Sequence, residues 1–322
     1  MASALNEKIV IAHRGASGYL PEHTLASKAL AYGMGAHFLE QDVVLTRDDH
    51  PIILHDIYLD TMTSVAIEFP GRERGDGRYY AIDFTLEEIK TLHVSERIDP
   101  LAKLVVHPNR FPWGKSRFEI VTLREEIELI QGLNASMHRH TGIYPELKAP
   151  KFHTAEGKDL LQIALSILQE YGYTGRESRC FLQCFDSDAL RELRSKHKVR
   201  LPLVQLLGDE CREWDAFESG QLSVERWLNE IAAYAEGIAP DMEMVYGRRD
   251  QMKRPAYSSL VEQAHALGLF VHPYNCQADV LPEYANTMED VLEIFYSELD
   301  VEGLFTDFPD RAVRFLEHHA AG

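Results

Sequence analysis

The sequence predicts an α/β protein, a (β/α)8 TIM barrel with a loop-rich insertion between the second and third barrel strands. Three observations lead to this prediction. Short apolar runs recur along the chain, helical periodicity separates most of them, and 322 residues suit one barrel as well as two ordinary domains. Alternation of strands and helices indicates a parallel sheet, and eight strand candidates favour a closed barrel over an open sheet.

Eight runs of apolar or β-branched residues are the strand candidates. They span residues 8–12, 38–45, 143–147, 180–185, 201–207, 237–239, 269–274 and 303–306. Segments with helical periodicity lie between most of them, for example at 157–171 and 257–267. Strands are thus followed by helices, which is the order that a parallel barrel requires.

Helix boundaries are marked by residues that satisfy free backbone groups. A Thr followed three residues later by a Glu occurs at 85–88 and at 122–125, ahead of apolar-periodic runs, and this spacing predicts a capping box at a helix N-terminus. Gly33 and Gly172 lie where a helix C-terminus calls for a left-handed residue. Helices are therefore expected to start after Thr85 and Thr122 and to end at these glycines.

One long segment, from Ile57 to about Phe118, breaks the alternation. It contains "PGRERGDGRYY" and "VHPNRFPWGKSRF", is rich in Gly, Pro, Arg and aromatic residues, and has a single short helix pattern near 86–92. We expect one domain over 1–322 that carries this segment as an insertion on the loop face of the barrel. The insertion would cover the active site, contact a second subunit or form a plain surface loop, and the sequence predicts no oligomeric state.

Composition limits the partners of the protein. Its 51 acidic and 33 basic side chains give a formal net charge of -18, which opposes binding to the phosphate backbone of a nucleic acid. A small phosphorylated ligand is compatible with this charge, because a pocket can differ in sign from the whole surface. No apolar stretch has the length of a membrane span. We therefore expect a small-molecule partner, no nucleic acid and no membrane span.

The four cysteines give no sign of a metal cage. Cys180, Cys184, Cys211 and Cys276 show no C-x-x-C pairing and none of the usual zinc spacings. Two of them, Cys180 and Cys184, lie in an apolar run. We expect buried free thiols.

Carboxylates that share a strand face form the first candidate site. In "FLEQDVVL", Glu40 and Asp42 project to one side of a strand, toward the barrel interior. In "YPELKAP", Glu146 points the same way from the next barrel strand, and three converging carboxylates suit Ca²⁺ or Mg²⁺. Lys148 would then hold a phosphate oxygen. The alternative is a set of ion pairs, in which Lys148 partners Glu146 or Asp42.

Two histidines follow strand-like runs and form the second candidate group. His13 stands with Arg14 in "IAHRGASGYLPEHT", and His55 stands with Asp56 in "PIILHD". Two imidazoles can serve as general base and general acid across one scissile bond, because they titrate near neutral pH. Arg14 offers a two-pronged donor to phosphate. The alternatives are hydrogen-bonded structural histidines, and an Asp56 that either orients an imidazole or only forms an Asx turn.

The later strands add polar and aromatic side chains near their ends. Gln183 and Phe185 in "LQCFD", with His272 and Tyr274 in "VHPYN", either shape a pocket for an alcohol or pack in the core. Asp307, two residues before a proline, is predicted to start a helix rather than to act in catalysis.

Taken in order, these motifs resemble those of one enzyme family. They are "HRG" with "PEHT", "LEQD", "LHD", "PELK", "LQCFD", "VHPYN" and "LFTDFPD". The chain resembles the glycerophosphodiester phosphodiesterase family from about Lys8 to His318. The stretches "GRYYAIDFTLEEIKTL", "GKSRF" and "GIYPELKAPKFHTAEGKDL" are similar to its bacterial periplasmic-type branch, which has the same insertion after its "HD" motif.

The resemblance implies a barrel that hydrolyses glycerophosphodiesters, such as glycerophosphocholine and glycerophosphoethanolamine, to glycerol 3-phosphate and an alcohol. It implies one divalent ion, with Ca²⁺ favoured in this branch and Mg²⁺ as the alternative. Residue by residue, it assigns metal binding to Glu40, Asp42 and Glu146, catalysis to His13 and His55, and phosphate binding to Arg14 and Lys148. Gln183, Phe185 and Tyr274 stay candidates for binding the substrate's alcohol group.

The sequence differs from the family pattern at two places, and the resemblance also implies a cellular location. His23 stands where many family members have Asn, a change shared with the periplasmic-type branch, and the residues after Tyr274 differ from that branch. The preferred head group is therefore not predicted. The branch implies a periplasmic location, although Met1 to Lys8 shows neither the basic nor the apolar region of a secretion signal. A cytoplasmic location is the alternative.

Two other functions fit the same scaffold. A barrel by itself implies no chemistry, so carboxylates and a lysine could serve a metal-dependent lyase or isomerase that stabilises an enolate. The His-Arg and His-Asp motifs argue against that enzyme. A non-catalytic binding protein is the third reading, and the presence of every expected ligand and histidine argues against it.

Overall fold

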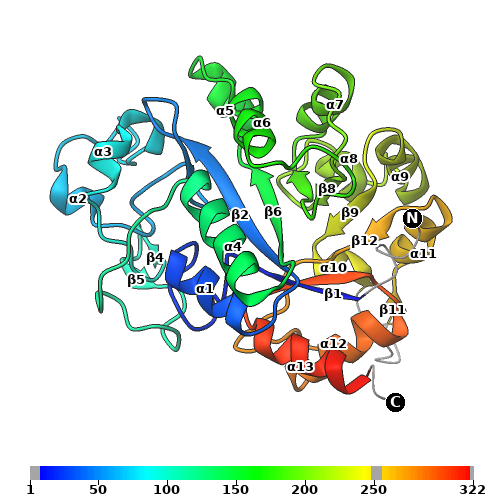
Figure 1. Cartoon of the computed structure of the whole chain (residues 1–322). Coiled ribbons are helices and arrows are strands. Elements are labelled where there is room, and N and C mark those ends of the chain that lie inside the picture. Colours follow the sequence, from blue (N-terminus) through cyan, green and yellow to red (C-terminus); the bar gives the residue numbers. More distant parts are fainter. Residues whose placement is uncertain (1–7, 248–255, 320–322) are drawn as a thin grey trace.

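The computed structural model describes residues 8–247 and 256–319, which form a parallel barrel wrapped by helices (Figure 1). Its strands are β1 (Ile9–Ala12), β2 (Phe38–Leu45), β6 (Gly142–Leu147), β7 (Leu182–Cys184), β8 (Leu203–Leu207), β9 (Gly237–Pro240), β12 (Phe270–Val271) and β13 (Gly303–Thr306). They neighbour one another in the order β12-β9-β8-β7-β6-β2-β1-β13. All eight strand predictions and the barrel are confirmed.

The last gap, between β12 and β13, is closed beyond the end of β12. The amide of Phe305 donates to the carbonyl of Pro273 at 3.0 Å, and the amide of Cys276 donates to the carbonyl of Phe305 at 2.8 Å. These bonds join the edge strands without a long ladder. The ring is therefore nearly continuous, and the strand ends surround one mouth.

Helices cover the outside of the barrel, and a second apolar layer fills the space between helices and strands. They are α1 (Leu25–Gly33), α4 (Leu123–Met137), α5 (Pro150–Ala155), α6 (Leu160–Glu170), α7 (Ser187–Ser195), α8 (Trp214–Glu218), α9 (Val224–Ala232), α10 (Met242–Val245), α11 (Leu260–Ala266), α12 (Met288–Leu292), which continues as a π-helix over Glu293–Glu298, and α13 (Pro309–His319).

The predicted helix signals are mostly confirmed. Both capping boxes form, at the start of α3 (Leu86–Ile89) and of α4. Gly172 follows α6 with a φ of +85°. The prediction for Gly33 was wrong, because Gly33 is the last residue of α1 and the left-handed position falls on Gly35, with a φ of +94°. The chain makes one more right-handed step, through Met34, before it turns back into β2.

Alternate residues of each strand fill the barrel interior. Ile9 and Ile11 of β1 pack with Phe38, Tyr144, Phe181, Val204, Leu206, Ala239, Phe270 and Phe305 in one buried cluster. Successive side chains of a strand point to opposite faces, so the next positions of the same parity also point inward, one step nearer the mouth. Those positions include 13, 40, 42, 146 and 183. The interior packing thereby aims the predicted site residues at one place.

The insertion has more regular structure than the single short helix predicted. After β3 (Pro51–Ile53), which pairs antiparallel with β2, it contains α2 (Val65–Glu68), a 3-10 turn at Ala81–Asp83, α3, and a hairpin of β4 (Ile98–Asp99) and β5 (Leu104–Val105). The segment lies to one side of the barrel, in cyan in Figure 1. It has its own core, with Val44, Ile52, Leu59, Phe84 and Ile89 among its members. The sequence missed α2 and the hairpin because elements this short have too few turns or alternations to show a period.

Three further expectations concern the cysteines, membrane-spanning helices and the N-terminal segment. The four cysteines are buried and free, as predicted. Within the described ranges, no helix combines the length and the apolar character needed to cross a bilayer. Of the N-terminal segment Met1 to Lys8, whose sequence shows neither region of a secretion signal, residues 1–7 lie outside the described part of the chain.

Candidate active site

Three carboxylates converge at the mouth of the barrel. Glu40 and Asp42 are on β2, Glu146 is on β6, and Asp42 and Glu146 are direct register partners in the two strands. One oxygen from each of the three lies within 4.8 Å of the others. All three side chains are buried. Because they are two residues apart or in register, strand geometry alone brings them together.

Burial and neighbouring charges shift the pKa values of the three carboxylates in different directions. Burial, and then the neighbouring charges of Asp42 and Glu40, raise the pKa of Glu146 well above its usual range, although Lys148 opposes the shift. Burial also raises the pKa of Glu40. Burial works against ionisation of Asp42 too, yet contact with His23, including a hydrogen bond, holds the Asp42 pKa well below normal.

A hard divalent cation fits these residues. Asp42 Oδ1 is buried and has no hydrogen-bond partner among the described residues, and neither has Gln183 Oε1 beside the cluster. Oxygen donors that lack a proton donor, in a buried site with excess negative charge, are the set that Ca²⁺ and Mg²⁺ bind. Glu40, Asp42 and Glu146 are therefore the residues that could hold a metal.

Neighbouring side chains fix the carboxylates in place. Gln183 Nε2 donates to Glu40 Oε1 at 3.0 Å. Lys148 Nζ lies 2.8 Å from Glu146 Oε1, which is the ion pair that the sequence left open as an alternative to phosphate binding. His23 Nε2 lies 2.6 Å from Asp42 Oδ2, and burial lowers the pKa of His23 to about 4. One face of the cluster is thus packed, and Arg14 and the two candidate catalytic histidines occupy another.

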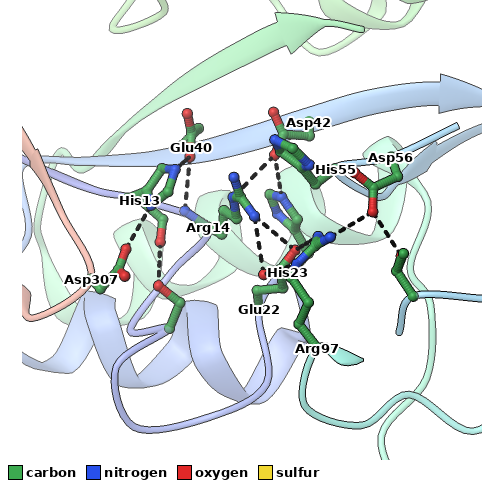
Figure 2. Close-up of polar contacts among 12 residues, drawn as sticks. His13, Arg14, Glu22, His23, Glu40, Asp42, His55, Asp56, Arg97 and Asp307 are labelled. Carbon is green, nitrogen blue, oxygen red and sulfur yellow. Dashed lines mark hydrogen bonds and ion pairs between the residues drawn. The ribbon is translucent and has the colours of Figure 1, made fainter. Parts of the chain in front are cut away.

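His13 follows β1 and lies beside Glu40. Its Nε2 is 3.8 Å from Glu40 Oε2, and its Nδ1 is 2.6 Å from Asp307 Oδ1 (Figure 2). The side chain of Asn275 also reaches Nδ1, at 3.0 Å. The prediction for Asp307 as a helix-start residue was wrong. Helix α13 begins at Pro309, and the Asp307 carboxylate turns instead to the His13 ring.

His55 follows β3 and makes a matching pair with its chain neighbour. Its Nδ1 is 2.7 Å from Asp56 Oδ1, so Asp56 orients the imidazole, one of the two roles considered for it. Burial, and then the charges of Arg14 and Lys148, lower the pKa of His55 to about 3. A neutral ring whose Nδ1–H donates to a carboxylate has a free lone pair on Nε2. The bond to Asp56 therefore holds the His55 ring in one orientation, with Nε2 as its free nitrogen.

Arg14 crosses the space between the two histidines. Its backbone has a φ of 59°, and its amide donates to Glu40 Oε2 at 2.9 Å. The guanidinium Nη1 bonds both oxygens of Glu22 at 3.1 Å, and Nε lies 3.6 Å from Asp42 Oδ2. Figure 2 shows Arg14 framed by Glu40, Asp42 and Glu22. The side chain is positioned by carboxylates, with its charge next to the candidate metal ligands.

The three candidates for the alcohol pocket separate in the structure. Gln183 is fully buried against Glu40, so it does not line an open pocket. Phe185 and Tyr274 meet edge to face, with ring centroids 6.0 Å apart and an interplanar angle of 85°, and Lys148 Nζ is 5.6 Å from the centre of the Phe185 ring. His272 lies inside the barrel instead, where its Nδ1 is 3.0 Å from the Tyr144 hydroxyl. Phe185 and Tyr274 thus stay candidates for a wall beside Lys148.

Several polar residues of the site were not assigned a role from the sequence. They are Glu22, His23, Asn275, Gln277, Arg97 and Arg110. Glu22 and His23 lie in the "PEHT" motif, which was a signal for a functional role. Arg97 and Arg110 are two of several arginines in the insertion, and nothing in the sequence marked these two.

The fold and the site define a class: a (β/α)8-barrel enzyme with a buried carboxylate cluster that could hold a cation and two His-Asp pairs at the carboxyl ends of its strands. The model of the glycerophosphoryl diester phosphodiesterase family matches residues 13–311. A glycerophosphodiester phosphodiesterase of Haemophilus influenzae is 40% identical over 97% of this chain and 90% of its own, and one of Treponema pallidum is 35% identical over 98% and 94%. The chain belongs to this family and is an enzyme, a glycerophosphodiester phosphodiesterase.

Solved structures agree with the fold. A crystal structure from Silicibacter pomeroyi matches with a TM-score of 0.71 at 24% identity, over 98% of this chain and 95% of that one. A phosphodiesterase of Oleispira antarctica, in complex with its product sn-glycerol-3-phosphate, matches with a TM-score of 0.61 at 20% identity, over 97% of both chains.

Proposed function

We propose that this enzyme hydrolyses glycerophosphodiesters, such as glycerophosphocholine and glycerophosphoethanolamine, to glycerol 3-phosphate and the free alcohol, with one divalent cation and two catalytic histidines. The observation that carries the proposal is the placement of two His-Asp pairs beside three converging carboxylates. The names of the Haemophilus and Treponema relatives and the product bound to the Oleispira enzyme support the substrate class.

The chain's own residues account for most of the chemistry. A cation on Glu40, Asp42 and Glu146 would supply Lewis-acid charge to a non-bridging phosphate oxygen. Arg14 and Lys148 add fixed positive charge next to it, which favours the more negative transition state. The folded protein already holds both side chains in position, so neither has to reorganise during the reaction.

His13 and His55 divide the proton transfers. One imidazole takes the proton of the attacking oxygen as its bond to phosphorus forms, and the other gives a proton to the alcohol oxygen as its bond to phosphorus breaks. The attacking group is water, or a glycerol hydroxyl of the substrate, in which case a cyclic phosphate forms and water opens it.

We propose Ca²⁺ as the cofactor, with Mg²⁺ as the alternative. Ca²⁺ accepts irregular sets of oxygen ligands, whereas Mg²⁺ requires a near-octahedral set that three carboxylates complete only with waters. The resemblance to the periplasmic-type branch also favours Ca²⁺. Isothermal titration of the chelated protein with each ion decides between them.

We propose a periplasmic location on the resemblance to the same branch. A cytoplasmic location is the alternative. Fractionation of the source cells with an antibody against this protein tests it, and recovery with cytoplasmic markers would overturn it.

The test of the proposed reaction is release of glycerol 3-phosphate from glycerophosphocholine. The purified protein is assayed as isolated, after EDTA, and after separate return of Ca²⁺ or Mg²⁺. We expect activity that EDTA abolishes and one ion restores. Absence of release from every glycerophosphodiester with either ion would overturn the proposal.

A further inference from the structure

The aspartate that orients His13 uses its two oxygens for two different partners. Asp307 Oδ1 faces His13 Nδ1 at 2.6 Å. Asp307 Oδ2 accepts from Arg110 Nη2 at 2.7 Å and from Gln277 Nε2 at 2.7 Å. The carboxylate is therefore held at both ends, and the cation that holds its far end comes from the insertion.

The aspartate that orients His55 divides its oxygens in the same way. Asp56 Oδ1 faces His55 Nδ1 at 2.7 Å, while Asp56 Oδ2 accepts from Arg97 Nη1 at 2.6 Å and from Thr61 Oγ1 at 2.7 Å. Figure 2 shows Arg97 between Asp56 and Glu22, and Glu22 is the partner of Arg14. The two histidines thus have the same support, although they follow different strands.

The two arginines flank one short hairpin, β4 and β5. Arg97 directly precedes β4, and Arg110 follows β5 by a few residues. The carbonyl of Arg97 accepts from the amide of Val106 at 2.9 Å, so the base of the hairpin joins the two segments. The Arg110 side chain is 5% exposed and also holds Asp279, and that of Arg97 is 16% exposed. Neither arginine is a plain surface residue.

We propose that Arg97 and Arg110 are positioning residues for the two histidines, and that the insertion is needed for turnover because it supplies them. Each guanidinium fixes an aspartate, each aspartate fixes the Nδ1–H of one imidazole, and each Nε2 is thereby aimed at the phosphate. At metal sites, removing a residue that orients a functional side chain by a hydrogen bond typically lowers metal affinity or activity by about 10- to 100-fold. We expect a loss of activity of the same size when Arg97 or Arg110 is replaced. This inference rests on the proposed roles of His13 and His55.

A double-mutant cycle on the full-length, metal-loaded enzyme tests the path of the effect. Arg110→Met is expected to lower kcat by about 10- to 100-fold and to change KM by less than about twofold, because the imidazole and not the substrate site is disturbed. In an Asp307→Asn background, Arg110→Met should cost less than about threefold more, since the residue through which it acts is already altered. A full loss in that background would overturn the proposal. The corresponding pair is Arg97→Met with Asp56→Asn.

Arg74→Met is the matched control. Arg74 is also an insertion arginine with two hydrogen bonds to one aspartate, Asp83, but that aspartate touches no histidine of the site. We expect Arg74→Met to keep kcat within about twofold of the parent even if its Tm falls. An Arg110→Met variant that behaves like Arg74→Met in kcat would overturn the proposal.

A spectroscopic measurement separates this inference from the proposed reaction. Long-range ¹H–¹⁵N NMR spectra report which imidazole nitrogen carries the proton, and the His13 signals are identified by their loss in His13→Gln. We expect Arg110→Met, but not Arg74→Met, to change the His13 tautomer signals. If the parent enzyme releases no glycerol 3-phosphate, the proposed reaction fails, and this spectrum alone then decides the positioning role. Unchanged His13 signals in Arg110→Met would overturn it.

Discussion

Lys28 and Glu126 form an ion pair in which both side chains are fully buried, with Nζ and Oε1 2.8 Å apart. Lys28 also donates to the carbonyl of Glu40, and Gln41 Nε2 donates to Glu126 Oε1 at 2.7 Å. The pair therefore links α1 and α4 to the strand that carries two candidate metal ligands. We therefore expect the pair to stabilise the position of β2.

We predict that Lys28→Met destabilises the fold by about 3–5 kcal/mol, because it leaves the Glu126 carboxylate buried without its cation. Burial already raises the pKa of Glu126, so the unpaired group would be protonated on folding. The double variant Lys28→Met with Glu126→Gln should recover much of the loss. Urea unfolding measures both, and equal stabilities of the two variants would contradict the argument.

Removal of a candidate metal ligand should abolish stabilisation by the cation. Ca²⁺ at about 100 times its Kd is expected to add about 2.7 kcal/mol to the unfolding free energy of the chelated parent protein. Asp42→Asn and Glu146→Gln should show no such increase. Glu170→Gln, at an exposed pair with Arg124, is the control that keeps it. A Ca²⁺ shift that survives in Asp42→Asn would exclude that residue as a ligand.

Each candidate catalytic histidine should be required for turnover but not for the cation. His13→Ala and His55→Ala are expected to lower kcat by about 10²- to 10⁴-fold, the usual contribution of a general acid or base. Both should bind Ca²⁺ like the parent in isothermal titration. His50→Ala, at a half-exposed histidine whose ring pairs with Asp48 away from the site, should be fully active. Near-native turnover of either site variant removes that histidine from the mechanism.

The barrel interior should make the protein sensitive to acid. Burial lowers the pKa of His272 to about 3, so the ring is neutral when folded and takes up a proton only on unfolding below its ordinary pKa of 6.5. Its contribution to stability is full above pH 6.5 and falls as the pH drops from 6.5 toward 3, by about 2 kcal/mol between pH 7 and pH 5.

His272→Asn should remove that part of the pH dependence, because Asn keeps an acceptor for the Tyr144 hydroxyl and does not titrate. Urea unfolding of the EDTA-treated proteins at pH 7 and pH 5 measures the difference. An unchanged loss of stability between the two pH values would show that other groups, such as the buried His153 whose pKa is lowered to about 4, account for it.

Residue types and their periods were sufficient to predict the barrel and the carboxylate cluster. Glu40 and Asp42 share a face because strand side chains alternate, and Glu146 meets them because consecutive strands of a parallel barrel are neighbours. His55 and Asp56 are adjacent in the chain, so their pairing was among the options. These relationships are local, or follow from one regular rule of the fold.

The contact of His13 with Asp307 was not predictable in this way. The two residues are 294 positions apart, and an aspartate two residues before a proline is typical of a helix start. A closed barrel places β1 beside β13 but does not decide which side chains meet beyond the strand ends. Arg97 and Arg110 lie in a segment without a period, where nothing separates them from the other arginines.

The sequence by itself determined the eight strands, the inward faces and the family, because apolar periodicity and short motifs are written within a few residues. Only the tertiary structure decided which carboxylate holds which histidine and which arginine holds that carboxylate. Those pairings depend on barrel closure and on where the insertion packs, and both are set by many weak apolar contacts between residues far apart in the chain.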